Sequence, residues 1–157
     1  MLGLAVDELP TPTVLVDLDI LERNIARMAA RARDAEIRLR PHLKTHKCLE
    51  IGRLQLAAGA GGACVAKVGE GEVFARAGFD DIFVAYPVVG DDKGRRLLAL
   101  ADRARLAVGV DSAEGARSLA APFREAGRTF LCTRGNHCEL RRHHKRCNSH
   151  PPLPTAR

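Results

Sequence analysis

A lysine surrounded by other cationic or protonatable side chains lies in the segment RPHLKTHK, residues 40–47. An isolated lysine has a pKa near about 10.4, so its amine is almost wholly protonated at pH 7. Neighbouring positive charge and partial desolvation both favour the neutral amine, which can condense with an aldehyde. The segment therefore predicts a nucleophilic amine at Lys44, with a lowered pKa.

The backbone that carries this lysine is expected to be extended from residue 37 to residue 47. Alternation along a strand would then place one set of side chains on a polar face and another on a packing face. The polar set is Arg40, His42, Lys44 and His46, and the packing set is Leu39, Pro41 and Leu43. A basic cluster on a solvated loop is the alternative, but the cluster follows a predicted strand, and parallel α/β folds build their sites there.

The elements that must position these groups alternate along the chain. Apolar runs predict strands at residues 11–19, 37–44, 63–68, 81–86 and 106–110. Helical spacing predicts helices from about residue 20 and at residues 49–58, 69–77, 93–101 and 112–126. This alternation is typical of βαβ units with a parallel sheet, so the predicted class is α/β.

Periodicity does not separate an open doubly wound sheet from a (β/α)8 barrel. No phosphate-binding glycine motif follows any predicted strand. Gly59, Gly61 and Gly62 precede the strand at 63–68, so we interpret them as a helix cap and a tight turn.

Composition narrows the class of protein. The 157 residues are 46% hydrophobic and 28% charged, as in a soluble globular domain. The net charge of +6 is uneven, because residues 130–157 contribute six basic side chains against one acidic. With one Tyr and no Trp, a platform for stacking nucleic-acid bases is missing. We expect no nucleic-acid partner, no membrane span or leader, and a cytoplasmic protein.

The predicted pattern stops after residue 129. Residues 130–157 form a basic tail without apolar period, and they contain Cys132, Cys138, Cys147, His137, His143, His144 and His150. A metal-binding tail is one interpretation, although no CxxC pair occurs and the spacings differ from those of common zinc modules. We favour a disordered or out-of-frame tail after a barrel part at residues 1–129, and we assign no metal ligand.

Three segments together resemble a known family. They are LPTP with VLVDLDILERNIARMA, RPHLKTHK, and GACVAKVGEGEVFARAGFDDIFVAYPVVG. They resemble the N-terminal half of the D-serine dehydratase and D-threonine aldolase group, which has the alanine-racemase-like fold of pyridoxal-phosphate enzymes. The resemblance covers residues 7–128 and implies a partial (β/α)8 barrel, of which this chain carries four or five strands.

The resemblance also implies residue roles. The first lysine of PHxKTHK carries pyridoxal phosphate in the family and corresponds to Lys44, whereas Lys47 is interpreted as a solvated residue near the next helix. His42 and His46 would touch the cofactor or tune Lys44. The family implies a divalent metal, but its ligands are absent from this chain.

The resemblance therefore implies a lyase that dehydrates D-serine or cleaves a D-threonine-type substrate by retro-aldol chemistry. The small-molecule partner would be a D-amino acid, and the complete protein would be a homodimer. Two other functions stay open: a non-catalytic pyridoxal-phosphate homeostasis protein of the same barrel type, and a small metal- or nucleic-acid-binding protein that acts through the basic tail.

Overall fold

The computed structural model describes residues 3–129, 131–134 and 141–142. Its α-helices in the described part are α1 (Leu18–Asp34), α2 (Leu49–Ala57), α3 (Val68–Arg76), α4 (Asp91–Ala101) and α5 (Ala113–Glu125). Two short 3₁₀ turns are η1 (Val6–Glu8) and η2 (Leu43–Thr45). The strands are β1 (Ile37–Arg38), β2 (Ala63–Val65), β3 (Asp81–Val84), β4 (Arg105–Val110), β5 (Leu131–Arg134) and β6 (Arg141–Arg142).

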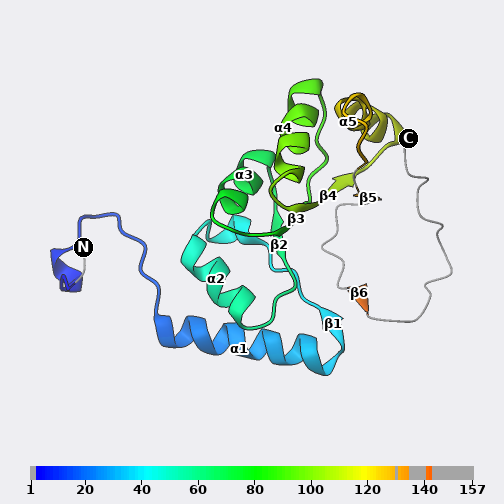
Figure 1. Cartoon of the computed structure of the whole chain (residues 1–157). Helices are drawn as coiled ribbons and strands as arrows, with labels where there is room; N and C mark the ends of the chain where they lie inside the picture. The colour runs from blue at the N-terminus through cyan, green and yellow to red at the C-terminus, as the bar shows by residue number, and fades with distance from the viewer. Residues whose placement is uncertain (1–2, 130, 135–140, 143–157) are drawn as a thin grey trace.

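The main sheet has the order β2-β3-β4-β5, and each pair is parallel. Its register places Cys64 beside Phe83 and Phe83 beside Ala107. Helices α3, α4 and α5 follow the strands in turn and lie along the sheet, while α1 lies beyond α2 and away from it (Figure 1). Strands that alternate with helices in one parallel sheet confirm the predicted α/β class.

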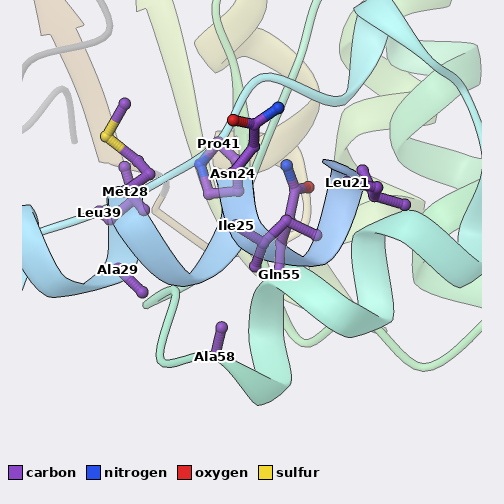
Figure 2. A pocket seen from close by; sticks show the side chains of 9 residues that line it. All are labelled: Leu21, Asn24, Ile25, Met28, Ala29, Leu39, Pro41, Gln55 and Ala58. Atoms are coloured by element: carbon purple, nitrogen blue, oxygen red, sulfur yellow. The ribbon is translucent and has the colours of Figure 1, made fainter. Parts of the chain in front are cut away.

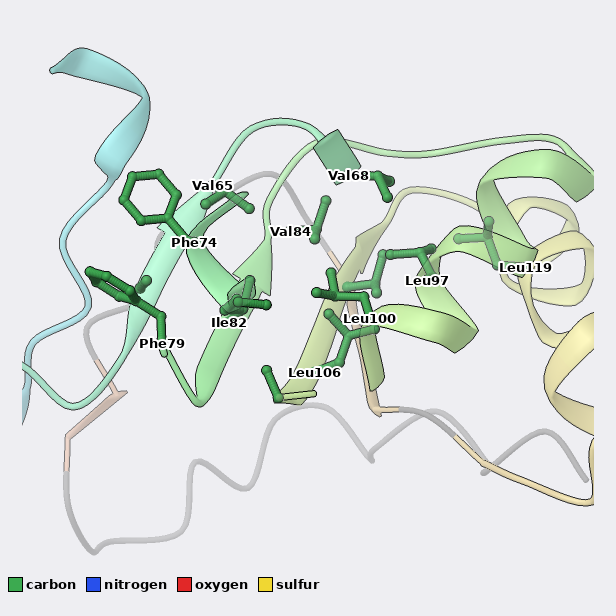
Figure 3. Packing of buried hydrophobic residues seen from close by; sticks show 14 of the residues in the cluster. Val65, Val68, Phe74, Phe79, Ile82, Val84, Leu97, Leu100, Leu106 and Leu119 are labelled. Carbon is green, nitrogen blue, oxygen red and sulfur yellow. The ribbon is translucent and has the colours of Figure 1, made fainter. Parts of the chain in front are cut away.

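Successive apolar side chains of each strand are buried on opposite faces of the sheet. Val65, Ile82 and Val84 pack in one cluster with side chains from the helices, including Phe74, Leu97, Leu100 and Leu119 (Figure 3). Val108 and Phe123 belong to the same cluster. The intervening positions form a second, smaller cluster of Cys64, Phe83 and Ala85 on the opposite face. A parallel strand buried on both faces is expected to be apolar throughout, which explains runs such as DIFV.

The strand predicted at residues 11–19 is wrong. Residues 13–17 form neither a helix nor a strand, and α1 already begins at Leu18. Three apolar side chains of this segment are exposed: Val14 (91%), Leu15 and Val16. The segment has strand-like composition, but a strand also needs a hydrogen-bonded neighbour, and the described residues provide none for it.

The strand predicted at residues 37–44 is shorter than expected. Regular pairing is confined to Ile37 and Arg38, which lie antiparallel to β6. The chain then runs beside β2, where Gly61 N donates to Leu39 O at 2.8 Å and Cys64 N donates to Pro41 O at 2.9 Å. The turn η2 ends this extended run at Leu43, so the predicted alternation does not reach Lys44.

Local capping signals agree with the helix ends. The Asp17 carboxylate accepts a hydrogen bond from Ile20 N at the start of α1, and the Ser112 hydroxyl accepts one from Gly115 N at the start of α5. Gly59 follows the C-cap of α2 with φ of 104°, which confirms its predicted role after that helix. Among the described helices, none has the length and apolar character needed to cross a bilayer.

The predicted tail is largely outside the described residues. Leu131–Arg134 form β5 and pair with β4, and Cys132 packs against the core. Residues 135–140 and 143–157, with the histidines and remaining cysteines of the predicted tail, lie outside the described part. The interpretation of residues 130–157 therefore stays a prediction.

Candidate functional site

Lys44 lies at the carboxyl end of the parallel sheet. The extended run that precedes it makes a parallel bridge to β2 between His42 and Cys64, so the two segments end on the same side. Leu43, at the first position of η2, is only 1% exposed and belongs to the main core. The buried Leu43 thus fixes the backbone of η2 at the edge where parallel α/β proteins assemble their sites.

The Lys44 amine contacts a residue that follows β3. Its Nζ atom donates a hydrogen bond to the Tyr86 hydroxyl at 2.8 Å and lies 4.7 Å from the centre of the Tyr86 ring. The hydrogen bond to Tyr86 raises the pKa of Lys44 and outweighs the slight desolvation that would lower it. The expected lowering of this pKa is therefore wrong for the described structure.

Two ion pairs explain why the cationic neighbours do not lower the pKa of Lys44. Arg40 pairs with Asp81 at the opposite end of the sheet. Lys47 pairs with Glu70, with 3.4 Å between Nζ and Oε1. Each of these charges has a carboxylate beside it, so neither acts on Lys44 as a bare positive charge.

His42 and His46 both lie next to Lys44 in the chain and are partly buried. His42 Nδ1 accepts a long hydrogen bond of 3.4 Å from Lys44 N, and His46 Nδ1 accepts one of 3.0 Å from Cys48 N. Burial and the charge of Lys44 lower the pKa of His42. Within the described residues, the Nε2 atom of each ring is buried without a hydrogen-bond partner. Buried polar atoms are normally paired, so these two are available to a polar ligand.

Glu70 joins the Lys44 turn to the end of β2. Its Oε2 atom accepts hydrogen bonds from Ala66 N at 2.8 Å and Lys67 N at 3.3 Å, and its Oε1 atom pairs with Lys47. Burial would raise the pKa of Glu70, but these backbone hydrogen bonds and Lys47 outweigh it and lower the pKa. Lys47 keeps an exposed side chain, as predicted, although it is ion-paired.

Sequence reasoning missed Tyr86 and Glu70. A signal for Tyr86 was present, because the only tyrosine of the chain stands directly after the apolar run DIFVA. Glu70 stands three residues after Lys67, the N-cap of α3, in the spacing of a capping box. Neither signal shows which element brings the residue to Lys44, because that depends on strand order.

An ion-pair cluster marks the other end of the sheet. Asp81 is buried, with 5% of the residue exposed. Its carboxylate accepts hydrogen bonds from Arg38, Arg40 and Arg105. Gly62 lies against it with φ of 149°, where an added Cβ would come within 2.8 Å of the Asp81 carbonyl oxygen. The predicted shared face of Arg40 and Lys44 is therefore wrong: the two side chains serve opposite ends of the sheet.

An apolar pocket of about 340 Å³ lies between α1 and α2, next to residues 39–41 (Figure 2). It is lined by Leu21, Ile25, Met28, Leu39 and Pro41, with Asn24 and Gln55 among its polar members. It therefore lies on the helix side of the extended run, and Lys44, His42 and His46 are absent from its lining. Among the described residues, no group of three metal-ligating side chains occurs, so no metal centre is assigned there.

The chain matches known proteins over most of its length. The family model of the alanine racemase N-terminal domain matches residues 16–133. The D-threonine aldolase of an Arthrobacter species is 41% identical over 117 residues, which cover 74% of this chain and 31% of that protein. The D-serine dehydratase of Dictyostelium discoideum is 35% identical over 88 residues, which cover 53% of this chain and 22% of that protein.

A solved structure agrees with these matches. The crystal structure of D-threonine aldolase from Filomicrobium marinum superposes with a TM-score of 0.79 at 39% identity, over 86% of this chain and 38% of that one. The resemblance noted from the sequence is thereby confirmed, and so is the expectation of part of an alanine-racemase-like barrel. The chain spans about a third or less of the length of the curated relatives reported above.

Proposed function

The chain belongs to the alanine racemase N-terminal domain family, which is pyridoxal-phosphate-dependent, and from this premise we propose that it serves a lyase acting on D-amino acids, with Lys44 as the cofactor lysine. The observation that carries the proposal is the position of the Lys44 amine. It lies at the carboxyl end of the sheet, on a turn fixed by buried Leu43 and beside the Tyr86 hydroxyl.

The residues around Lys44 fit the polar cofactor. The buried Nε2 atoms of His42 and His46 have no partner within the described residues, so each can bind a polar group without losing an internal hydrogen bond. The lowered pKa of His42 favours the neutral ring, and because Nδ1 accepts a hydrogen bond from Lys44 N, the ring proton lies on Nε2, which can donate to a polar ligand. We therefore retain His42 and His46 as cofactor-binding candidates.

When bound, pyridoxal phosphate supplies an electron sink for the bond that breaks at Cα or between Cα and Cβ. Lys44 holds a proton on Nζ while it donates to Tyr86. In its neutral form, this amine would accept a proton from the substrate, as a general base. The two histidines would orient the ligand by their Nε2 atoms.

Two reactions are consistent with the relatives, whose names include an aldolase and a dehydratase. D-serine dehydration would yield pyruvate and ammonia, whereas retro-aldol cleavage of D-threonine would yield glycine and acetaldehyde. For the whole protein we propose a cytoplasmic homodimer with a small D-amino acid as its substrate. The divalent metal that the resemblance implies finds no ligand group among the described residues, so we assign it no step.

The test is a titration with pyridoxal phosphate, followed by borohydride reduction and peptide mapping. The chain offers the lysines Lys44, Lys47, Lys67, Lys93 and Lys145. We expect a visible absorbance band and a reduced adduct on Lys44, both lost in Lys44→Ala and retained in Lys47→Ala. An adduct on Lys47, or label spread evenly over the lysines, would refute the assignment.

The same lysine site would also serve a protein that binds pyridoxal phosphate without turnover. Assays for pyruvate from D-serine and for glycine from D-threonine separate the two functions. An adduct on Lys44 with neither product would favour the non-catalytic function, whereas either product, lost in Lys44→Ala, would establish the lyase.

A further inference from the structure

Tyr86 is held firmly although its side chain is about half exposed. Sheet hydrogen bonding continues up to the residue before it, because Ala85 N donates to Val65 O at 2.9 Å. Ala85 itself is buried at 3% exposure. Tyr86 is therefore the first residue beyond the last hydrogen bond between β2 and β3, and its backbone position is set by the sheet.

The Lys44 amine is fixed from two sides. Its backbone belongs to η2, which buried Leu43 anchors in the core. Its Nζ atom is 2.8 Å from the Tyr86 hydroxyl oxygen, at the far end of a side chain with four rotatable bonds. A free lysine side chain samples many rotamers, and fixing one of them costs side-chain entropy. The tyrosine thus selects one rotamer before any ligand arrives.

We propose that Tyr86 is the positioning residue for Lys44, and that its hydroxyl holds Nζ at the carboxyl end of β3, where the amine must meet the aldehyde of the cofactor. This inference rests on the proposed role of Lys44. The hydroxyl oxygen accepts a hydrogen bond from Nζ, so this bond also favours the ammonium form of Lys44. That preference lasts until the aldehyde takes the place of the hydroxyl beside Nζ. The ring face, 4.7 Å from Nζ, adds a cation–π contact that favours the same form of the amine.

Two variants separate the hydroxyl from the ring. Tyr86→Phe keeps the ring and removes the hydroxyl, whereas Tyr86→Leu removes both. The first readout needs no cofactor: acetic anhydride labels free amines, and its reaction with each lysine is followed against pH by peptide mapping. Lys93, which pairs with Asp92 on α4, serves as the internal reference.

We expect the Lys44 labelling profile to move to lower pH in Tyr86→Phe, because the ammonium loses its hydrogen-bond acceptor, while the Lys93 profile stays in place. In Tyr86→Leu we expect a larger move, because the ring contact is also lost. An unchanged Lys44 profile in Tyr86→Phe would overturn the inference. A loss of thermal stability without a change in that profile would also overturn it, since that is the result of a merely structural role.

The second readout is the share of reduced pyridoxal-phosphate adduct on Lys44 among the labelled lysines. We expect this share to fall in Tyr86→Phe, because the amine is no longer held in one rotamer. An equal share in the variant and the wild-type protein would overturn the positioning role. If wild-type protein forms no adduct at Lys44, the proposed function fails, and the anhydride profile still decides whether Tyr86 controls this amine.

Discussion

Two regions of this chain have the same kind of sequence and differ in burial. The sheet half, residues 63–128, contains apolar runs such as those of β3 and β4, which are buried on both faces. The N-terminal arm, residues 13–34, contains the run VLV and the amphipathic helix α1. Val65 is 0% exposed in the first region, whereas Val14 is 91% exposed in the second.

The difference shows that apolar composition specifies a strand only where a neighbouring strand is available. Strands β2, β3 and β4 each receive hydrogen bonds from the next strand in the order, and α3, α4 and α5 cover one face. Residues 13–17 have no such neighbour among the described residues. The free energy of burial therefore comes from neighbouring strands and helices, which the sequence of the strand itself does not specify.

The most demanding test of this comparison is a matched pair of leucine truncations. Leu97 on α4 is 0% exposed and packs in the main core, whereas Leu18 at the start of α1 is 63% exposed. We expect Leu97→Ala to lower the free energy of unfolding by about 2–5 kcal/mol, because it leaves a cavity. For Leu18→Ala we expect a change within about 0.5 kcal/mol, as at other exposed sites. Urea denaturation followed by circular dichroism measures both.

Equal losses in the two variants would break the comparison, because Leu18 would then be packed in solution. A matched valine pair extends the test: Val65→Ala in β2 and Val14→Ala in the arm remove the same atoms. The ranking of the two pairs must agree if burial alone controls the effect.

The second prediction concerns the amino end of the sheet half. Burial would raise the pKa of Asp81, but hydrogen bonds and charges from Arg40 and Arg105 outweigh it and lower this pKa. Asp81→Asn removes the only carboxylate that the three arginines of the cluster are seen to share. We expect this substitution to lower the free energy of unfolding by about 2 kcal/mol at pH 7. The loss is no larger because the side chains of Arg38 (48%) and Arg105 (72%) are exposed, and solvent weakens their ion pairs.

The contribution of Asp81 to stability depends on pH. A carboxyl group with a lowered pKa in the folded protein contributes stability above its unfolded value of about 3.9, and this contribution disappears as the pH falls through the folded value. The difference between wild type and Asp81→Asn should therefore be constant from pH 7 to about 5 and shrink below about 4. A difference that instead grows in acid would contradict the lowered pKa.

Much of the fold could be predicted from the sequence, and the reasons are local. Helices α2 to α5 and strands β2 to β4 follow from apolar periodicity, and Ser112 and Gly59 mark helix ends with side-chain and backbone signals. The strand at residues 11–19 could not be excluded, because its composition matches that of the buried strands. It differs from them only in having no paired neighbour within the part of the chain that the structure describes.

The candidate site was predictable in position and less so in electrostatics. The motif that contains Lys44 follows an extended run, so its place at the carboxyl end of the sheet could be expected. The direction of its pKa shift depends on Tyr86, which lies 42 residues away and meets Lys44 only through the order of β2 and β3. The partners of Arg40 and Lys47 likewise come from strand register and helix placement.

The smallest expected effect lies where the two regions join. Lys47 follows η2 and pairs with Glu70 on α3, but its side chain is 63% exposed, and exposed ion pairs contribute about 0–1 kcal/mol. We expect Lys47→Gln to change the free energy of unfolding by less than about 0.5 kcal/mol, and this small change to vanish in 0.5 M salt because salt screens the pair. Lys93→Gln, which removes an exposed pair with Asp92, is the matched control. A loss above about 1 kcal/mol that persists in salt would show that the Lys47 contact, rather than buried Leu43, holds the Lys44 turn against the sheet half.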